Sequence, residues 1–357
     1  MSRPGAFEAA VARLGGAVPD LDRNAEAAAA ERQSRLLKPA GSLGRLEELG
    51  IRLAAIAGRC PPPVPAKPAV LVAAGDHGVV AQGVTPWPQA VTGAIVSAMT
   101  AGQAAVNAIA AAIGAEVRLL DVGVAAAPAP HPMVRQGNVR RGTADLAVAP
   151  AMTREQAAAA VLEGAAAAAE LLDAGADLLV TGDMGIGNTT PAACLIAAFT
   201  GRAPVAVTGR GTGIDGATFE LKVKVVERAL ERHAPDTADP LGVLASVGGL
   251  EHGALAGLAL AGATRRVPVL LDGVNAGAAA LLAAAIEPHV TGFLIAGHRS
   301  VEPGASAAME HLGLAPLLDL QMRLGEGTGA LLAVPIVRSA AAVLEGMATF
   351  AEAGLEG

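Results

Sequence analysis

Aromatic side chains are scarce in this sequence. Among 357 residues there is one tryptophan, there are five phenylalanines and there is no tyrosine, so aromatic residues make up only 2% of the chain. Proteins that hold single-stranded nucleic acid stack its bases on aromatic rings, and this chain offers few of them. Its formal net charge of -7 at pH 7 would also repel a phosphate backbone. We therefore expect no nucleic-acid partner.

Cysteine is equally rare, and the histidines are scattered. Cys60 and Cys194 are the two cysteines, and they lie far apart with no CxxC pair. The seven histidines form neither an HxH nor an HxxxH pattern. A zinc site needs grouped ligands, and a disulfide framework needs several cysteines at close spacing. The sequence thus predicts no metal site, and a reducing cytoplasm fits it.

Long uninterrupted apolar runs are also missing. The alanine-rich stretches 97–113 and 267–286 approach the length of a membrane span, but polar residues such as Asn107 and Asp272 interrupt them. The opening stretch 1–22 has early acidic residues and no apolar centre, unlike a secretion signal. We therefore expect a cytoplasmic protein that does not enter a membrane.

What is abundant is alanine, within a hydrophobic content of 52%. Alanine at this density favours closely packed helices. Leucine and isoleucine recur every three to four residues over 22–58, which predicts helix there. This region ends at the proline-rich segment 60–68, CPPPVPAKP, which is the best candidate for a domain boundary.

Beyond that segment, six short apolar runs recur, most of them separated by helix-like sequence. They are PAVLVAAG, EVRLLDVG, DLLVTG, PVAVTG, VPVLLDG and TGFLIAG. Such runs are typical of strands buried on both faces of a parallel sheet, so an α/β fold is expected. The glycine and polar residues that follow them would gather at the carboxyl edge of the sheet, where ligands bind.

One of these corners, GDMGIGNTT at 182–190, lies between an apolar run and an apolar helix-like segment. Its backbone N–H groups could hold a phosphate at a helix N-terminus, with Met184, Gly185, Asn188 and Thr189 as candidate substrate contacts. It differs from a Walker A loop because Asn188 stands in place of the lysine, and Asp183 would repel a polyphosphate. A nucleoside triphosphatase is therefore disfavoured, while a plain strand-to-helix turn remains an alternative.

A second corner, GRGTGIDG at 209–216, contains a GxGxxG pattern after the run PVAVTG. In a dinucleotide fold an acidic residue about 20 positions later should close the next strand. Asp236 and Asp239 lie instead in a segment that contains proline. Lys222 follows in the next helix-like segment, where it could meet a monophosphate. Alternatively, Lys222 is an ordinary solvated helix lysine.

Near the C-terminus a single carboxylate, Glu326, lies among three glycines in the segment RLGEGTGALLA. Glycine at this density usually indicates close approach of another surface. A carboxylate between Leu324 and the apolar segment that follows would be partly desolvated, which raises its pKa towards that of a general base. An acidic residue that complements a helix N-terminus is the alternative.

The segment around Trp87 offers polar groups on one predicted helix face. Gln89, Gly93 and Ser97 follow at four-residue spacing and could donate to the edge of a heterocycle. Core packing would explain Trp87 equally well. His77, in the corner AGDHG, is expected to be a structural, hydrogen-bonded histidine.

Together these segments resemble the nicotinate-nucleotide:dimethylbenzimidazole phosphoribosyltransferases of cobalamin nucleotide-loop assembly. The resemblance covers nearly the whole chain in order. It is carried by KPAGSLGRLEELG, AGDHGV, GTADLAVAPAMT, GDMGIGNTT, GRGTGID, VGGLEHGALAG, GHRSVEPG and RLGEGTGA.

The resemblance implies a Rossmann-like large domain with a parallel sheet, a small helical domain built from both chain ends, and a homodimer. The corresponding boundaries are 1–62, 63–329 and 330–357. It implies transfer of a phosphoribosyl group from nicotinate mononucleotide to a benzimidazole-type base, without a cofactor.

The resemblance also assigns residue roles. It implies that Glu326 is the catalytic base and that Lys222, Gly185 and Ser300 bind the ribotide phosphate. Gln89 and Leu324 would lie near the acceptor base. The family usually has GEMGIGNTT, so Asp183 is one methylene shorter than the glutamate expected to assist the base. In addition, GLEHGA replaces a more apolar run, which bears on acceptor preference.

Two other functions remain open from the residues. The GxGxxG pattern would suit an NAD-dependent dehydrogenase. A non-catalytic nucleotide-binding relative would keep the phosphate loops but lack the base, and the intact Glu326 argues against it.

Overall fold

The computed structural model describes residues 5–355 and has an α/β fold built on a six-stranded sheet. The strand order is β3-β2-β1-β4-β5-β6, and every neighbouring pair is parallel. This confirms the predicted fold class. The strands are β1 (Pro68–Gly75), β2 (Glu116–Gly123), β3 (Val134–Gln136), β4 (Leu178–Met184), β5 (Val269–Leu271) and β6 (Leu294–Ala296).

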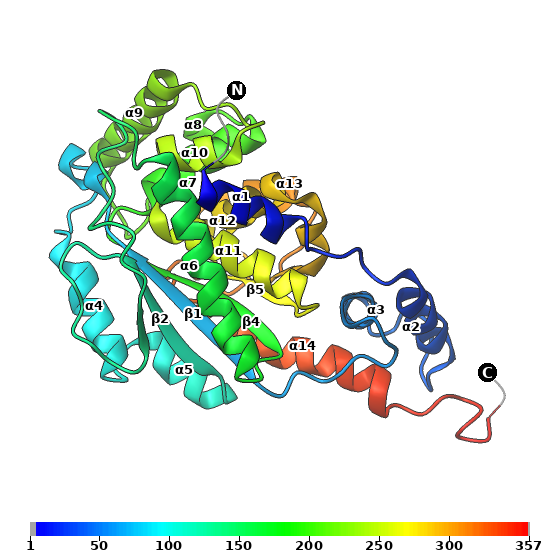
Figure 1. Cartoon of the computed structure of the whole chain (residues 1–357). Coiled ribbons are helices and arrows are strands. Elements are labelled where there is room, and N and C mark those ends of the chain that lie inside the picture. The colour runs from blue at the N-terminus through cyan, green and yellow to red at the C-terminus, as the bar shows by residue number, and fades with distance from the viewer. Residues whose placement is uncertain (1–4, 356–357) are drawn as a thin grey trace.

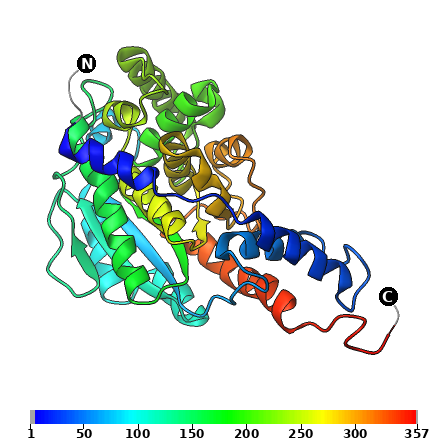
Figure 2. The same cartoon turned by 45° about the vertical axis from the view of Figure 1, so that its right-hand side comes forward.

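Helices cover both faces of the sheet (Figures 1 and 2). Strand β1 is buried along its whole length, and its side chains alternate between the two faces. Ala69, Leu71 and Ala73 belong to one core cluster, and Val70 and Val72 belong to the other. On the first face lie α1 (Ala6–Gly15), α6 (Arg154–Asp173), α7 (Thr189–Thr200), α11 (Leu250–Thr264) and α12 (Val274–Ile286). On the second lie α4 (Ala90–Thr100), α5 (Ala105–Ile113) and α14 (Thr328–Gly346).

The remaining helices extend the molecule in two directions. Five of them flank the first face or its loops: η1 (Gly78–Gln82), α8 (Pro204–Val207), α9 (Gly216–His233), α10 (Pro240–Val247) and α13 (Pro303–His311). The short helix η2 (Pro288–Phe293) leads into β6. Helices α2 (Arg23–Arg35) and α3 (Arg45–Ala57) lie beside the end of α14, away from the sheet (Figures 1 and 2).

Both ends of the chain meet in that small helical cluster. Ala29 of α2, Ala54 of α3 and Leu344 of α14 form its buried centre. The Arg32 guanidinium donates to the carbonyl of Leu344 at 2.6 Å. Helix α1, in contrast, packs on α6. The domain boundaries 1–62, 63–329 and 330–357 stay a prediction, and residues 1–4 and 356–357 lie outside the described part.

The sequence assigned one strand and one helix wrongly. The run PVAVTG is not a strand: it contains α8, which starts at Pro204, and Val205 is 56% exposed. The sixth strand is instead β3, an edge strand that follows a proline-containing segment. Because it has only three residues, VRQ, it carries no apolar run. Residues 22–58 form two helices because the intervening loop contains glycines at positive φ, Gly41 (72°) and Gly44 (53°).

Two helical stretches are long and apolar enough to cross a membrane, by length and composition alone. They are Ala90–Ile113, whose apolar window is 22% buried, and Thr328–Gly346, whose window is 50% buried. Core helices pass the same test, so this is weak evidence. Val96, Met99 and Val106 of the first stretch are buried in the core of the second face. That the chain does not enter a membrane stays a prediction.

Candidate functional site

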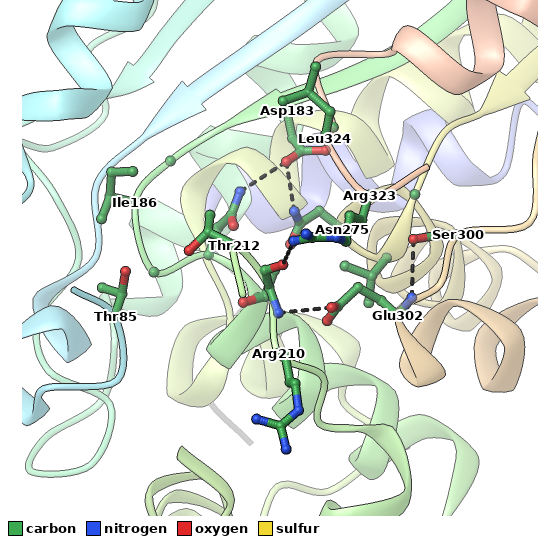
Figure 3. Close-up of a pocket in the computed structure, with 18 of the residues that line it drawn as sticks. Thr85, Asp183, Ile186, Arg210, Thr212, Asn275, Ser300, Glu302, Arg323 and Leu324 are labelled. Atoms are coloured by element: carbon green, nitrogen blue, oxygen red, sulfur yellow. Dashed lines mark hydrogen bonds between the residues drawn. The ribbon is translucent and has the colours of Figure 1, made fainter. Parts of the chain in front are cut away.

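The loops at the carboxyl edge of the sheet enclose a cavity (Figure 3). It contains about 850 Å³ of empty space, part of it open to solvent. Figure 3 shows Thr85 and Ile186 on one side of it and Ser300 and Glu302 on the other. Eight residues of the predicted site line it: Asp183, Met184, Gly185, Asn188, Thr189, Lys222, Ser300 and Leu324.

The loop between β4 and α7 forms one wall of this cavity. Gly185 can only be glycine, because a Cβ there would lie 2.2 Å from the carbonyl oxygen of Gly75. The next glycine, Gly187, has a φ of 86°. The N–H of Ile186 is bonded to the Thr92 hydroxyl at 3.0 Å. The loop is therefore held rigidly against the end of β1, as expected for a preorganised phosphate-binding turn.

Lys222 is a buried lysine rather than a solvated one. Lys222 is 2% exposed, and its Nζ donates to Thr189 Oγ1 at 2.7 Å and to the carbonyl of Gly209 at 3.0 Å. Burial lowers the pKa of Lys222 to about 8, against the attraction of the Glu302 carboxylate. An ammonium has three donors, so one N–H remains for an anionic ligand.

The glycine loop beside Lys222 is held by an acidic residue that the sequence did not single out. The Glu302 carboxylate accepts a hydrogen bond from the N–H of Gly211 at 2.8 Å, and the backbone N–H of Glu302 donates to Ser300 Oγ at 3.3 Å. A Cβ on Gly209 would overlap this carboxylate. A dinucleotide fold requires a strand before the GxGxxG pattern, but here the short helix α8 precedes it.

Glu326 occupies a strained position between two glycines. Its backbone φ of 62° lies in the left-handed region, which residues other than glycine rarely adopt. Gly325 (88°) and Gly327 (82°) are left-handed as well. The Glu326 N–H donates to the carbonyl of Asp183 at 3.2 Å, which joins this loop to the end of β4. Such strain, held by surrounding contacts, is typical of functional sites.

Asp272, at the end of β5, fixes the same loop. Its two carboxylate oxygens accept the N–H of Gly327 at 3.2 Å and that of Ala330 at 3.0 Å. These N–H groups belong to the first turn of α14, which has no partner for them inside the helix. Asp272 therefore sets the position of Glu326 through the helix that follows it.

The Glu326 carboxylate lies behind the cavity rather than on its lining. The residue is 7% exposed, and Oε2 accepts the N–H of Val106 of α5 at 3.3 Å. Burial raises the pKa of Glu326, the Val106 N–H opposes that shift, and Asp272 adds to it. The Glu326 side chain thus contacts the N-terminus of α5. The alternative considered from the sequence was contact with the N-terminus of the helix that follows Glu326, which is α14.

Asp183 is the carboxylate that faces the cavity. Its Oδ2 accepts from the side-chain amides of Asn188 at 2.9 Å and Asn275 at 2.6 Å (Figure 3). Its Oδ1 is buried and has no hydrogen-bond partner among residues 5–355. Burial raises the pKa of Asp183 to about 7, with the charge of Asp272 adding to the shift.

The side chains expected near an acceptor base are spread over a wider area. Leu324 is 59% exposed at the cavity and Met184 lines it. Gln89 donates to the carbonyl of His77 at 2.8 Å, and Ser97 donates within α4 to the carbonyl of Gly93 at 2.9 Å. Neither Gln89 nor Ser97 lines this cavity, so their contact with a base stays a prediction.

Trp87 and His77 differ in their environments. Trp87 is 49% exposed, so core packing does not explain it. His77 is fully buried, with Nε2 at 3.1 Å from Glu251 Oε1, but neither of its ring nitrogens has a hydrogen-bond partner among residues 5–355, so the predicted hydrogen bond is not found.

Three site residues were missed in the sequence. Asp272 and Asn275 stand out there only as polar interruptions of an apolar stretch, yet a buried strand that ends in Asp-Gly-x-Asn is itself a signal. Glu302 precedes Pro303, the first residue of α13, and a lone acid between an apolar run and a helix start was the available hint. What these residues contact depends on the fold and could not be seen.

Comparisons with known proteins identify the family of this chain. A family model described as phosphoribosyltransferase matches residues 18–355. A nicotinate-nucleotide–dimethylbenzimidazole phosphoribosyltransferase of Salinispora tropica is 60% identical, over 96% of this chain and 98% of that protein. One of the same name from Chloroflexus aurantiacus is 53% identical, over 94% of this chain and 95% of its own.

Solved structures give the same answer. The crystal structure of the nicotinate-nucleotide–dimethylbenzimidazole phosphoribosyltransferase of Thermus thermophilus superposes with a TM-score of 0.90 at 48% identity, covering 94% of this chain and 100% of that one. The chain therefore belongs to the family of nicotinate-nucleotide–dimethylbenzimidazole phosphoribosyltransferases.

Proposed function

We propose that this protein transfers the phosphoribosyl group of nicotinate mononucleotide to 5,6-dimethylbenzimidazole or a related base, giving α-ribazole 5′-phosphate and nicotinate. The observation that carries the proposal is the placement of Glu326: a desolvated carboxylate in a strained glycine loop, bonded through its backbone to Asp183 at the cavity. Membership of the family supports the same reaction.

The chemistry of the donor calls for a base and not for an acid. The pyridinium ring of nicotinate mononucleotide carries positive charge, so it leaves C1′ as a neutral ring and needs no proton. The attacking azole nitrogen becomes positively charged unless its other ring N–H loses a proton. A carboxylate with a raised pKa suits that proton transfer. Neither a metal nor a redox cofactor enters this scheme.

In this proposal Glu326 takes the azole proton, and the azole attacks C1′ on the face opposite to the departing pyridine. Attack from that face inverts the configuration at C1′. Glu326 Oε2 holds one long bond to Val106, which an acceptor N–H can replace or share. Holding two rings on opposite faces of one sugar is where we expect most of the rate acceleration to arise.

Lys222 is proposed to bind the ribotide phosphate together with the loop at Gly185 and with Ser300. Its ammonium is desolvated, and the glycine loops beside it leave room for an anion to approach the backbone. An anion next to a buried cation offsets the loss of hydration that the cation suffered on folding. The negative group would thus anchor the donor at one end of the cavity.

We also infer that the protein acts on small molecules in the cytoplasm as a homodimer. The apolar window of Ala90–Ile113 is only 22% buried in the single chain, and a second copy could cover the exposed alanines of α4 and α5. Sedimentation of the purified protein tests this: a monomer at micromolar concentration would contradict it.

The rival dehydrogenase hypothesis has lost its main support, because the GxGxxG pattern follows a short helix and not a strand. Titration of NADH fluorescence tests it independently, and micromolar binding would revive it. A non-catalytic relative would bind nicotinate mononucleotide but release no nicotinate.

The deciding assay is incubation with nicotinate mononucleotide and dimethylbenzimidazole while released nicotinate is measured. We expect release that depends on the base. The matched pair of variants is Glu326→Gln, which keeps the size of the side chain but removes the carboxylate, and Glu310→Gln, which changes an exposed acid that does not line the cavity. No nicotinate release by the wild-type protein would contradict the proposed function.

A further inference from the structure

A row of buried charged and polar side chains leads from helix α11 to the cavity. Glu251 and His252, in the first turn of α11, are both fully buried. Glu251 Oε1 lies 2.9 Å from His252 Nδ1 and 3.1 Å from His77 Nε2. Fully buried charged side chains are rare in proteins unless they are paired with other polar or charged groups.

Glu251 is held as a carboxylate. Burial alone would raise the pKa of Glu251, but the two imidazoles beside it hold that pKa well below its usual range. Its place in the first turn of a helix favours the negative charge as well. A Cβ on Gly249 would lie 2.5 Å from its Oε1, so the surrounding backbone is packed tightly around it.

His252 lies between two acceptors. Its Nδ1 faces Glu251, and its Nε2 lies 3.2 Å from Asn275 Oδ1. Nε2–H donates to the Asn275 amide oxygen, whereas the Nδ1 contact with Glu251 lacks hydrogen-bond geometry and is an ion pair when the ring is an imidazolium. Burial lowers the pKa of His252, but Glu251, Asp183 and Asn275 together raise it by more, so the net shift is upward.

The orientation of Asn275 follows from His252. Because its Oδ1 faces a donor, its Nδ2 is turned towards Asp183 and donates to Oδ2 at 2.6 Å. Asn188 donates to the same oxygen at 2.9 Å. Both donors therefore hold one oxygen of Asp183, a residue that lines the cavity, and the buried Oδ1 is left without a partner among the described residues. An unpaired buried acceptor of this kind is costly unless a ligand supplies a donor.

We propose that Glu251 and His252 are positioning residues that act through Asn275 to fix the Asp183 carboxylate, so that its Oδ1 accepts a hydrogen bond from a hydroxyl or ring N–H of the bound substrates. The inference rests on the proposed transfer reaction, whose base is Glu326. It gives the Asp183 side chain a fixed direction. Neither Glu251 nor His252 contacts the cavity; both act at a distance through one amide.

A double-mutant cycle on turnover tests the coupling. His252→Leu should lower kcat about tenfold in the wild-type background but less than about twofold when Asp183 is already Asn, because the effect passes through that carboxylate. The KM for nicotinate mononucleotide should change by less than about twofold in both backgrounds. His252→Gln, which can still donate to Asn275, should recover most of the lost kcat.

The control is His233→Leu, because His233 is partly buried and bonded to the carbonyl of Leu146 at 2.8 Å but does not line the cavity. It should lower stability without a change in kcat. An equal loss for His252→Leu in both Asp183 backgrounds would show a merely structural role and overturn the inference. Full activity of His252→Leu would overturn it too.

A second measurement needs no turnover and remains decisive if His252→Leu does not fold. In protein labelled with ¹⁵N-histidine, both ring nitrogens of His252 should carry protons at neutral pH, and the Nε2–H resonance should move in Asp183→Asn. A neutral His252, or a resonance that does not move, contradicts the positioning role. If the wild-type protein releases no nicotinate while these NMR results hold, the proposed function fails but the coupled row does not.

Discussion

Two side chains that line the cavity respond oppositely to burial. Lys222, at the proposed phosphate end of the bound substrates, is a cation whose pKa is lowered to about 8, mainly by burial. Asp183, a carboxylate proposed to face their hydroxyl or ring N–H groups, has a pKa that is raised to about 7, again mainly by burial. Each charge is destabilised without substrate. A phosphate can restore the charged form of the first, and an azole or hydroxyl donor can restore that of the second, so the site is prepared for a ligand that is anionic at one end only.

The largest expected effect falls at the carboxylate end. Glu326→Gln should lower turnover by roughly 10² to 10⁴, the usual contribution of a general base, while the protein stays folded. Steady-state nicotinate release and circular dichroism measure the two properties. A fully active variant would remove Glu326 from its proposed role.

At the phosphate end, Lys222→Met should raise the KM for nicotinate mononucleotide by roughly tenfold to a hundredfold, since a charge-assisted bond to phosphate is lost. The KM for the unphosphorylated riboside should change little. Kinetics with both donors check this prediction, and equal losses for the two would contradict a phosphate role.

The pH dependence of stability should separate the two ends further. The pKa of Asp183 is raised on folding, so its contribution to the free energy of unfolding is present at low pH and is lost as pH rises towards about 7. The pKa of Lys222 is lowered on folding, so its contribution is present at high pH and is lost as pH falls towards about 8.

Urea unfolding of Asp183→Asn and Lys222→Met over a range of pH measures these contributions. Relative to wild type, Asp183→Asn should gain stability between about pH 4 and 7, and Lys222→Met should lose its advantage between about pH 8 and 10, each by at most a few kcal/mol. Parallel curves for wild type and variants would show that neither group titrates as described.

The smallest expected effect is a fractional proton. Binding of nicotinate mononucleotide near pH 8.5 should take up less than one proton, because the phosphate raises the pKa of the partly neutral Lys222 ammonium. Calorimetry in buffers with different ionisation enthalpies measures this uptake, and Lys222→Met should abolish it. Uptake that persists in the variant would place the titrating group elsewhere.

Most of the fold and half of the site could be predicted from the sequence, for a physical reason. Strands such as β1 are buried on both faces, so their apolar runs are visible, and glycines such as Gly185 mark close backbone contacts wherever they occur. The short edge strand β3 carries no such pattern, and in PVAVTG the proline at the start of a helix was mistaken for the start of a strand.

Residues that act through others left little trace in the sequence. Asp272, Glu302 and Asn275 matter because of what they meet after folding: a helix start, a glycine N–H and a carboxylate. The pattern around Glu326 predicted a desolvated acid correctly, but the direction of its side chain, towards Val106 of α5, depends on a segment about 220 positions away in the chain.

The configuration of the product shows directly whether the base attacks C1′ on the face opposite to the departing pyridine. The wild-type protein is incubated with nicotinate mononucleotide and dimethylbenzimidazole, and the ribotide formed is isolated and its anomeric configuration is determined by NMR. We expect a single α-ribotide of the base, formed in equal amount with nicotinate and nearly absent with Glu326→Gln. A β-ribotide, or nicotinate released without any base-containing product, would contradict it.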